Sequence, residues 1–489
     1  MVSFRVPCSR PLTAVALATW ACGRTDAPPR PPRSFAITHA TVIDGSGAPP
    51  STDVTVVVDA GRILDLGAAP AIPAGAEIVD GTGKFLVPGL WDMHVHTSWD
   101  RRFTMPLFVA NGVTGVREMF AKDLGAVLRA RREIAAGTLI GPRIVTAGRI
   151  IDGPNAGWPG SIVANTPAQG EQAVAETQSQ GADFVKVYSS LSREVYFAIA
   201  EAARARRIPF AGHVPTAVTA AEASEAGQKS IEHLTGIPIG PDIELDSLFA
   251  RFHRNGTWQT PTLTVLRVGA NPGDPSLSTN PNLRYVPYAL GGLWSLARRM
   301  AAGDTSQKRG DEKQGRFARQ LEMVGRMYRD SVGLLAGSDE PNPYTIPGFS
   351  IHDELALLVR AGVPPMAALM AATRNPAIFL GAEDSLGTIG RGKTADLVLL
   401  DANPLENIAN TRAITAVVLH GRLLRRPALD SILAGVERSR WRPGAAAVIL
   451  SGAILHRVPN AVFVVALGLS LTLVAAPLLL RRRRRARRT

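Results

Sequence analysis

The most constraining feature of this chain is an alternation of short apolar runs with longer amphipathic stretches. The apolar runs are typical of strands and lie at 113–117, 143–146, 184–188, 209–211, 230–232 and 333–336. The amphipathic stretches are typical of helices and include 122–136, 171–180, 193–206 and 217–226. Strands separated by helices form βαβ units with parallel strands. At least six such units predict an α/β fold, a distorted (β/α)8 TIM barrel over residues 89–384.

Shorter β-rich runs flank this region on both sides. Those before it lie at 35–42, 54–58, 62–66 and 77–79, and those after it at 386–389, 396–400 and 416–419. The first set predicts a small antiparallel unit that the second set completes. We therefore expect a composite β-sandwich domain built from residues 35–88 and 385–428. Two further segments are expected to be an inserted helical lid at 253–327, which is longer than one βα unit needs, and a linker at 429–460.

The charge of the chain is concentrated at its ends. The net charge is +13, but the last nine residues hold seven arginines and residues 1–34 carry a net +4. Only about +2 remains for the rest, so the basic character does not indicate a nucleic-acid partner. Both cysteines, Cys8 and Cys22, precede residue 23, which excludes a thiol nucleophile or a cysteine metal site in the body of the chain.

The two ends indicate membrane topology instead. Residues 1–22 have the basic and apolar regions of a signal peptide, and 23–34 are a Pro-rich linker. The uncharged stretch 461–480 is long enough for a transmembrane helix of roughly 30 Å, and the arginine-rich tail 481–489 is expected in the cytoplasm. We expect an exported protein anchored in the cell membrane with its main body on the periplasmic side. Lipidation of Cys22, and cleavage of the C-terminal segment as a sorting tail, stay open.

Histidines and an aspartate follow several of the predicted strands. His94 and His96 are two residues apart on one strand, so their rings point to the same face. His213, His233 and Asp339 each come just after another predicted strand. Because the carboxyl ends of barrel strands meet at one rim, these side chains are expected to converge there. Imidazole and carboxylate groups in such an arrangement are suited to a divalent metal.

A lysine lies inside one of the apolar strands. Lys186 stands in Asp-Phe-Val-Lys-Val-Tyr, where burial is costly unless the amine is paired or neutral. A neutral lysine can add CO2 and form a carbamate, which is an anionic oxygen ligand able to bridge two metals. A lysine paired with an acid, or one that extends along the barrel to solvent, is the alternative. Tyr188 shares a strand face with Lys186 and is a candidate for substrate binding, with packing at the barrel rim as its alternative.

Taken together, these motifs resemble the amidohydrolase superfamily, in its imidazolonepropionase-like and prolidase-like branch. The similarity rests on Pro-Gly-Leu-Trp-Asp-Met-His-Val-His at 88–96, Gly-His-Val-Pro at 212–215, Glu-His-Leu at 232–234, Gly-Ser-Asp at 337–339 and the closing segment 390–401. It implies a barrel with a β-sandwich and two divalent metal ions, expected to be Zn²⁺ although Mn²⁺ or Co²⁺ would also suit the ligands.

The resemblance also implies a role for each candidate residue. The more buried metal would be bound by His94 and His96, the second by His213 and His233, and carbamylated Lys186 would bridge them. Asp339 would complete the first site and act as the general base. The implied activity is hydrolysis of a C–N bond in a small molecule such as a dipeptide, an N-acyl amino acid or a cyclic amide.

The sequence departs from peptidases of this branch at two places. Residues 148–158 lack a histidine, and Pro215 stands where a tyrosine is frequent. The alternatives are a deaminase of the same superfamily and a non-catalytic, membrane-anchored binding module. Deaminases commonly lack the strand lysine and carry a glutamate where this chain has Thr216, which favours hydrolysis. Whether the chain forms a homo-oligomer is left open.

Overall fold

The barrel is the central element of the computed structural model, which describes residues 34–97, 101–240, 245–303 and 307–440. Its regular strands pair in parallel and are β6 (Leu90–Val95), β7 (Val113–Glu118), β8 (Arg143–Thr146), β11 (Val185–Val187), β12 (Phe210–Gly212), β13 (Ser230–Glu232) and β14 (Trp258–Thr260). Two short strands, β9 (Ile151–Asp152) and β10 (Ile162–Val163), extend the sheet beside β11. The chain therefore has the (β/α)8 barrel type of α/β fold.

Single bridges close the barrel where regular strands are missing. Ala147 pairs with Phe184 and so joins β8 to β11. In the eighth position, Leu334 pairs with Gln259, and Glu340 pairs with Val95 at the end of β6. The predicted strand at 333–336 is thus replaced by an irregular segment that still fills the eighth position. This irregularity positions Asp339, because its amide donates a hydrogen bond of 2.8 Å to the His94 carbonyl.

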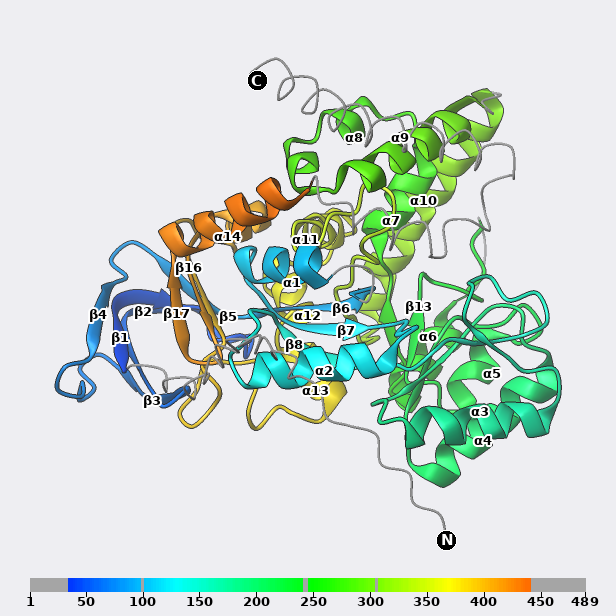
Figure 1. Cartoon of the computed structure of the whole chain (residues 1–489), viewed down its shortest axis with the longest axis horizontal. Coiled ribbons are helices and arrows are strands. Elements are labelled where there is room, and N and C mark those ends of the chain that lie inside the picture. Colours follow the sequence, from blue (N-terminus) through cyan, green and yellow to red (C-terminus); the bar gives the residue numbers. More distant parts are fainter. Residues whose placement is uncertain (1–33, 98–100, 241–244, 304–306, 441–489) are drawn as a thin grey trace, which may run out of the picture. The chain divides into compact units, whose positions relative to one another are not determined.

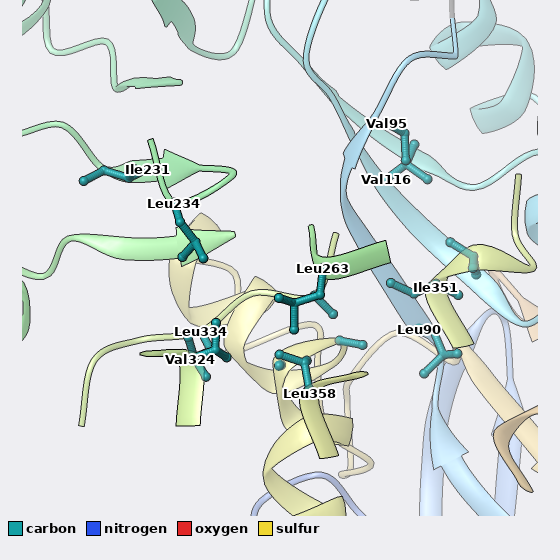
Figure 2. Packing of buried hydrophobic residues seen from close by; sticks show 14 of the residues in the cluster. Leu90, Val95, Val116, Ile231, Leu234, Leu263, Val324, Leu334, Ile351 and Leu358 are labelled. Carbon is teal, nitrogen blue, oxygen red and sulfur yellow. The ribbon is translucent and has the colours of Figure 1, made fainter. Parts of the chain in front are cut away.

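Helices surround the barrel and begin where capping residues predict. Thr166 accepts a hydrogen bond from the Gln169 amide, and Pro167 opens the following helix. The surrounding helices are α1 (Arg101–Ala110), α2 (Leu124–Ala135), α3 (Pro167–Ser179), α4 (Arg193–Arg206), α5 (Ala220–Glu225), α6 (Asp246–Asn255), α11 (Ser350–Arg360), α12 (Pro365–Ala371) and α13 (Arg374–Leu380). Their apolar faces form one core with the strands, as Leu90, Val116, Leu334 and Leu358 illustrate (Figure 2). Helices α12 and α13 are separate because the chain leaves the helical conformation at Thr373.

The inserted region is helical, as expected. It contains α7 (Leu263–Ala270), α8 (Pro275–Thr279), the 3-10 helix η1 (Pro281–Tyr285), α9 (Tyr288–Gly303) and α10 (Gln307–Arg329). Trp294 of α9 is buried with Phe103 of α1 and Tyr344, which attaches this region to the barrel. Val324 of α10 belongs to the main core, so α10 is also one of the barrel-covering helices (Figure 2).

Strands from both ends of the described chain form a single eight-stranded sheet (Figure 1). Its members are β1 (Phe35–Val42), β2 (Ser51–Asp59), β3 (Arg62–Gly67), β4 (Glu77–Asp80), β5 (Phe85–Pro88), β15 (Leu397–Leu400), β16 (Ile414–Leu419) and β17 (Arg422–Arg425). The two flanks meet where β15 pairs antiparallel with β5. The expectation of an antiparallel unit was wrong in part, because β1 pairs in parallel with β4 and β5. The expected strand at 386–389 does not form, although the Ile389 amide binds the Asp44 carbonyl.

The first part of the linker expected at 429–460 is helical instead. Helix α14 (Arg426–Ser439) continues directly from β17, and it buries Leu429 and Val436. Val436 packs with Phe103 of α1, so residues 429–439 are part of the folded body. The predicted signal peptide at 1–22, the Pro-rich linker at 23–34 except its last residue, and the transmembrane segment at 461–480 lie outside the described residues. Within the described ranges, no helix is long and apolar enough to cross a membrane.

Candidate active site

The predicted site residues converge at the carboxyl end of the barrel. Their side chains come from β6, β11, the ends of β12 and β13, and the irregular eighth segment, and they are His94, His96, Lys186, His213, His233 and Asp339. The Asp339 carboxylate lies among the imidazoles. Its Oδ1 is 3.0 Å from His96 Nε2 and 3.4 Å from His94 Nε2, and its Oδ2 is 4.0 Å from His233 Nδ1. The ring of His213 is 4.9 Å from that of His233 between centroids.

Local backbone geometry brings two of these groups into place. His233 and Asp339 have φ angles of 58° and 56°, in the left-handed region that non-glycine residues seldom adopt. Such conformations cost about 1–3 kcal/mol each and cluster at functional sites. Gly337 is required beside Asp339, because a Cβ there would lie 2.9 Å from His94 Cβ. The close approach of the eighth segment to β6 therefore depends on this glycine.

Three of the four imidazoles also have a hydrogen-bonding partner at Nδ1. His94 Nδ1 is 2.8 Å from Glu232 Oε2, His213 Nδ1 is 2.7 Å from Ser189 Oγ, and His233 Nδ1 is 2.6 Å from Thr262 Oγ1. Partners of this kind fix the tautomer and orientation of metal-binding histidines. No strand or spacing pattern in the sequence predicted the roles of Glu232, Ser189 or Thr262. A charged residue inside the apolar run 230–232 was the one signal that pointed to Glu232.

Glu232 belongs to a fully buried ion pair inside the barrel. Its two oxygens lie 2.8 and 3.0 Å from Arg117 Nη2, and both side chains are at most 1% exposed. Arg117 also donates to the Met93 carbonyl at 2.6 Å and to Ser230 Oγ at 2.8 Å. The positive charge of Arg117 thus keeps Glu232 ionised, although burial alone would raise the pKa of that carboxyl. An ionised Glu232 accepts the Nδ1–H of His94 and leaves Nε2 free toward Asp339.

Lys186 is buried at the centre of this group. The residue is 1% exposed, and burial lowers the pKa of its amine to about 8. Its ammonium makes no hydrogen bond to any residue in the described ranges, and Glu232 and Asp339 are the acids that act on it through charge. Gly212 on the neighbouring strand leaves room for its stem, because a Cβ there would be 3.0 Å from Lys186 Cδ. Such an amine carries a substantial neutral fraction near neutral pH.

The protonation states of the imidazoles and of Asp339 favour binding of a cation. Burial, followed by the charge of Lys186, lowers the pKa of His94 and of His213 well below the usual value, so both rings are neutral. Burial alone would lower the pKa of His96, but its hydrogen bond to Asp339 and the charge of Glu118, 3.8 Å away, raise it to about 9. The neighbouring imidazoles lower the pKa of Asp339 against the effect of its burial. In the metal-free chain a proton on His96 therefore balances the Asp339 carboxylate, and metal ligation would displace that proton.

These residues fit a divalent metal. Ligand atoms of His94, His233 and Asp339 lie within 4.8 Å of one another. Atoms that bind a common ion at about 2.0–2.2 Å lie at most about 4.4 Å apart, so small side-chain movements would bring these three groups into ligation. His96 Nε2 approaches the same carboxylate, whereas the resemblance placed His233 with His213 at a second ion. Asp339 thus lies between the pair His94 and His96 and the pair His213 and His233.

Tyr188 lies at the rim of this site. Its ring stacks on His213 with 3.9 Å between centroids, and its hydroxyl accepts a hydrogen bond of 2.7 Å from Trp158 Nε1. Beside it, a small hollow is lined by His96, Phe120, Trp158, Pro341 and Asn342. Aromatic groups therefore form one wall next to the converging imidazoles.

Comparison with known proteins agrees with this arrangement. The model of the amidohydrolase family matches residues 85–424. The chain belongs to the amidohydrolase family. The match spans both the barrel and the strands β15 and β16, and every converging residue falls inside it. Family membership makes the protein a metal-dependent hydrolase of carbon–nitrogen bonds, which sets aside the alternative of a non-catalytic binding module.

Several relatives of this amidohydrolase have a stated activity. Ochratoxinase from Aspergillus niger is 24% identical over 412 residues, covering 70% of this chain and 76% of that protein. Among solved structures, a bottromycin amidohydrolase superposes with a TM-score of 0.69 at 23% identity, covering 84% of this chain and 91% of that one. A Xaa-Pro dipeptidase with bound methionine superposes with a TM-score of 0.62 at 22% identity, covering 80% of this chain and all of that one.

Proposed function

We propose that this amidohydrolase is a binuclear enzyme that hydrolyses an amide bond in a small substrate, such as a dipeptide or an N-acyl amino acid. The single observation that supports this most is the position of Asp339. Its carboxylate lies within 3.0–4.0 Å of ring nitrogens of His94, His96 and His233. A carboxylate shared in this way is suited both to hold a cation and to exchange a proton with a water beside it.

Two ions would be held by residues of this chain on either side of Asp339. His94 and His96 would bind the first ion, and His213 and His233 the second. Lys186, as a carbamate, would lie between them. When bound, the divalent ions, for which Zn²⁺ is the first candidate, would lower the pKa of a water and polarise the substrate carbonyl.

The residues of the chain then account for the proton steps. Asp339 takes one proton from the attacking water as the new C–O bond forms. It passes that proton to the leaving nitrogen as the C–N bond breaks, so that a carboxylic acid and an amine are released. Glu232 and Thr262 hold the rings of His94 and His233 throughout. The buried position of Asp339 keeps bulk water from competing for its proton.

Lys186 supports a hydrolase over the alternative deaminase. The pKa of about 8 leaves part of the amine neutral, as carbamylation by CO2 requires. A carbamate would also supply the negative charge that a second cation needs beside neutral imidazoles. The deaminase alternative would place a glutamate where this chain has Thr216, and no observation favours it.

The substrate class is inferred from the aromatic wall and from the named relatives. Tyr188 and Trp158 hold each other by a hydrogen bond and face the edge of the site. This wall would position the acyl or side-chain group of the substrate. Ochratoxinase, the bottromycin amidohydrolase and the Xaa-Pro dipeptidase are the relatives that motivate testing amide and dipeptide substrates. We also propose that the enzyme is exported and anchored in the membrane by segment 461–480, with the barrel in the periplasm.

A substrate library tests the activity. The full chain, loaded with zinc and bicarbonate, is assayed against dipeptides and N-acyl amino acids, and its metal content is measured. We expect amide cleavage and about two metals per chain. Asp339→Asn should lower kcat by at least 100-fold, whereas His253→Asn on α6 should leave it unchanged. One metal per chain, or cleavage that persists in Asp339→Asn, would contradict the proposed site.

A further inference from the structure

A second cavity lies at the opposite end of the barrel from the metal site. It measures about 300 Å³ and is bordered by residues at the amino-terminal ends of the strands and by the region of α13. Its lining residues are Trp91, Arg117, Arg143, Val145, Asp183, Phe184, Pro209, Ala211, Lys229, Phe379, Leu380, Ala382 and Leu386. A volume of this size is at the lower end of the range for small-molecule pockets.

The walls of this cavity are mainly apolar and aromatic. Trp91 and Phe379 are 3% and 5% exposed, and Leu380 and Leu386 pack in the same cluster. Gly115 lets the Trp91 indole lie against β7, because a Cβ at that position would be 2.2 Å from the ring. The cavity can therefore accept a hydrocarbon chain or a ring.

Lys229 adds a positive charge without an acidic partner. Its Nζ lies 4.7 Å from the centre of the Phe379 ring, and it forms no ion pair or hydrogen bond with any residue in the described part of the chain. Burial and the charge of Arg117 both lower the pKa of this amine, and no acid raises it. A cation over an aromatic face, next to a cavity, is a favourable place for an anionic group.

The other charged groups of the lining differ in how far they are paired. Arg117 and Asp183 have close partners, whereas Arg143 has only a long contact. Arg117 is committed to Glu232, Ser230 and the Met93 carbonyl. Asp183, the acid of the lining, is paired with Arg131. The guanidinium of Arg143 reaches an acid at only 3.5 Å, and its buried Nε has no hydrogen-bond partner. Lys229 is thus the cation of this lining with no acid or hydrogen-bond partner in the described part of the chain, and Arg143 is held only by a long contact to Asp396.

We propose that this cavity binds a small amphipathic carboxylate. Its hydrocarbon part would lie against Trp91 and Phe379, and its carboxylate would accept from Lys229 and from Arg143. This ligand is distinct from the substrate, because the barrel interior with the buried Arg117–Glu232 pair separates the cavity from Asp339. The enzyme would then bind an apolar carboxylic acid at a site separate from its active site.

Equilibrium dialysis of radiolabelled octanoate against the full zinc-loaded chain tests the proposal, with octanol as the uncharged comparison. We expect one octanoate per chain from this site and weaker binding of octanol. Lys229→Met keeps the apolar stem, removes the charge and should weaken octanoate binding about tenfold, or about 1.4 kcal/mol, because a charge-assisted hydrogen bond is lost. Lys84→Met, which removes a lysine of the composite sheet paired with Asp401, is the matched control and should bind as the wild type does.

A second variant separates cavity binding from binding to the metals. Ala382→Trp places a large side chain in the lining and should abolish octanoate binding while the thermal unfolding midpoint stays close to that of the wild type. Octanoate that binds Lys229→Met and Ala382→Trp as well as it binds the wild type would overturn the proposal, as would a wild-type chain that binds no octanoate. The measurement requires no turnover, so failure of the proposed hydrolase activity would not affect it.

Discussion

Replacing Glu232 with glutamine separates two functions of one buried carboxylate. The substitution keeps the shape of the side chain but removes its charge. Arg117 would then stay buried with no counter-ion, and His94 Nδ1 would lose an anionic acceptor at 2.8 Å. Both effects arise from the Glu232 carboxylate. Because Glu232 is 0% exposed, water cannot replace either lost interaction.

The magnitudes follow from the two contacts. Breaking a fully buried ion pair by removing one partner costs about 3–5 kcal/mol, because the remaining charge is not solvated. Loss of the partner that orients a metal-binding histidine typically costs 10–100-fold in metal affinity or activity. We therefore expect Glu232→Gln to lower the free energy of unfolding by several kcal/mol and to weaken zinc binding by at least tenfold.

Denaturant unfolding and zinc competition with a chromogenic chelator measure the two effects separately. Glu77→Gln is the matched control, since it breaks an exposed pair with Arg425 that contributes at most about 1 kcal/mol. The double variant Arg117→Met/Glu232→Leu removes both charges and should regain most of the stability but not the zinc affinity. If Glu232→Gln binds zinc as the wild type does, then Glu232 does not orient His94 and the reasoning fails.

Three further predictions concern the other buried groups. Lys186→Ala should abolish turnover and lose the second metal, and propionate should restore both in part if a carbamate bridges; unchanged activity would exclude the bridge. Removing metal with a chelator should lower the free energy of unfolding by about 2.7 kcal/mol for each ion, relative to zinc at 100 times its Kd, and added zinc should reverse the change; an identical melting curve would refute this. Burial raises the pKa of Glu354 to about 8, so this group makes unfolding easier as pH rises from about 4.5 to 8. Glu354→Gln should therefore lose less stability than the wild type between pH 5 and 8, and a parallel loss in urea unfolding would contradict it.

The parts of the fold that the sequence predicted best are those with local signals. Helix α4 was predicted at its observed bounds, because Ser192 caps its start and an apolar stripe runs along it. Strands β8 and β13 were also placed correctly, since each is a short apolar run between helices. Segment 386–389, Leu-Gly-Thr-Ile, was also expected to be a strand but forms none, and its Gly387 has a φ angle of 82°. It lies against the loop at Asp44, so its environment also determines its conformation.

Longer-range contacts explain the other differences. Helix α14 was not assigned because its partner, α1, is more than 300 residues away in the sequence. The parallel pairing of β1 with β4 and β5 could not be inferred from alternation, because parallel and antiparallel strands share a period of two. In each case the sequence specified the element or its face, and tertiary packing decided the partner.

The same distinction between local signals and long-range contacts applies to the residues of the candidate site. The histidines, Lys186 and Asp339 could be identified because each follows or lies within a predicted strand, and a barrel brings strand ends together. Their supporting partners could not, because a hydroxyl such as Ser189 or Thr262 gains its role only from a ring 24 or 29 residues away. Conformation also mattered at Asp339, whose positive φ turns the side chain toward the imidazoles and is invisible in composition.

The Arg117–Glu232 pair shows why a barrel interior can carry charge at a net cost. Two apolar side chains of similar volume would stabilise a core as well or better. An apolar pair, however, could not accept the Nδ1–H of His94 or keep its Nε2 available toward Asp339. The same arginine forms part of the wall of the cavity at the far end of the strands. The donors of Arg117 are used inside the barrel, so Lys229 supplies the unpaired positive charge of the cavity. The Arg117–Glu232 pair thus contributes both to the orientation of His94 at one end of the barrel and to the wall of the cavity at the other.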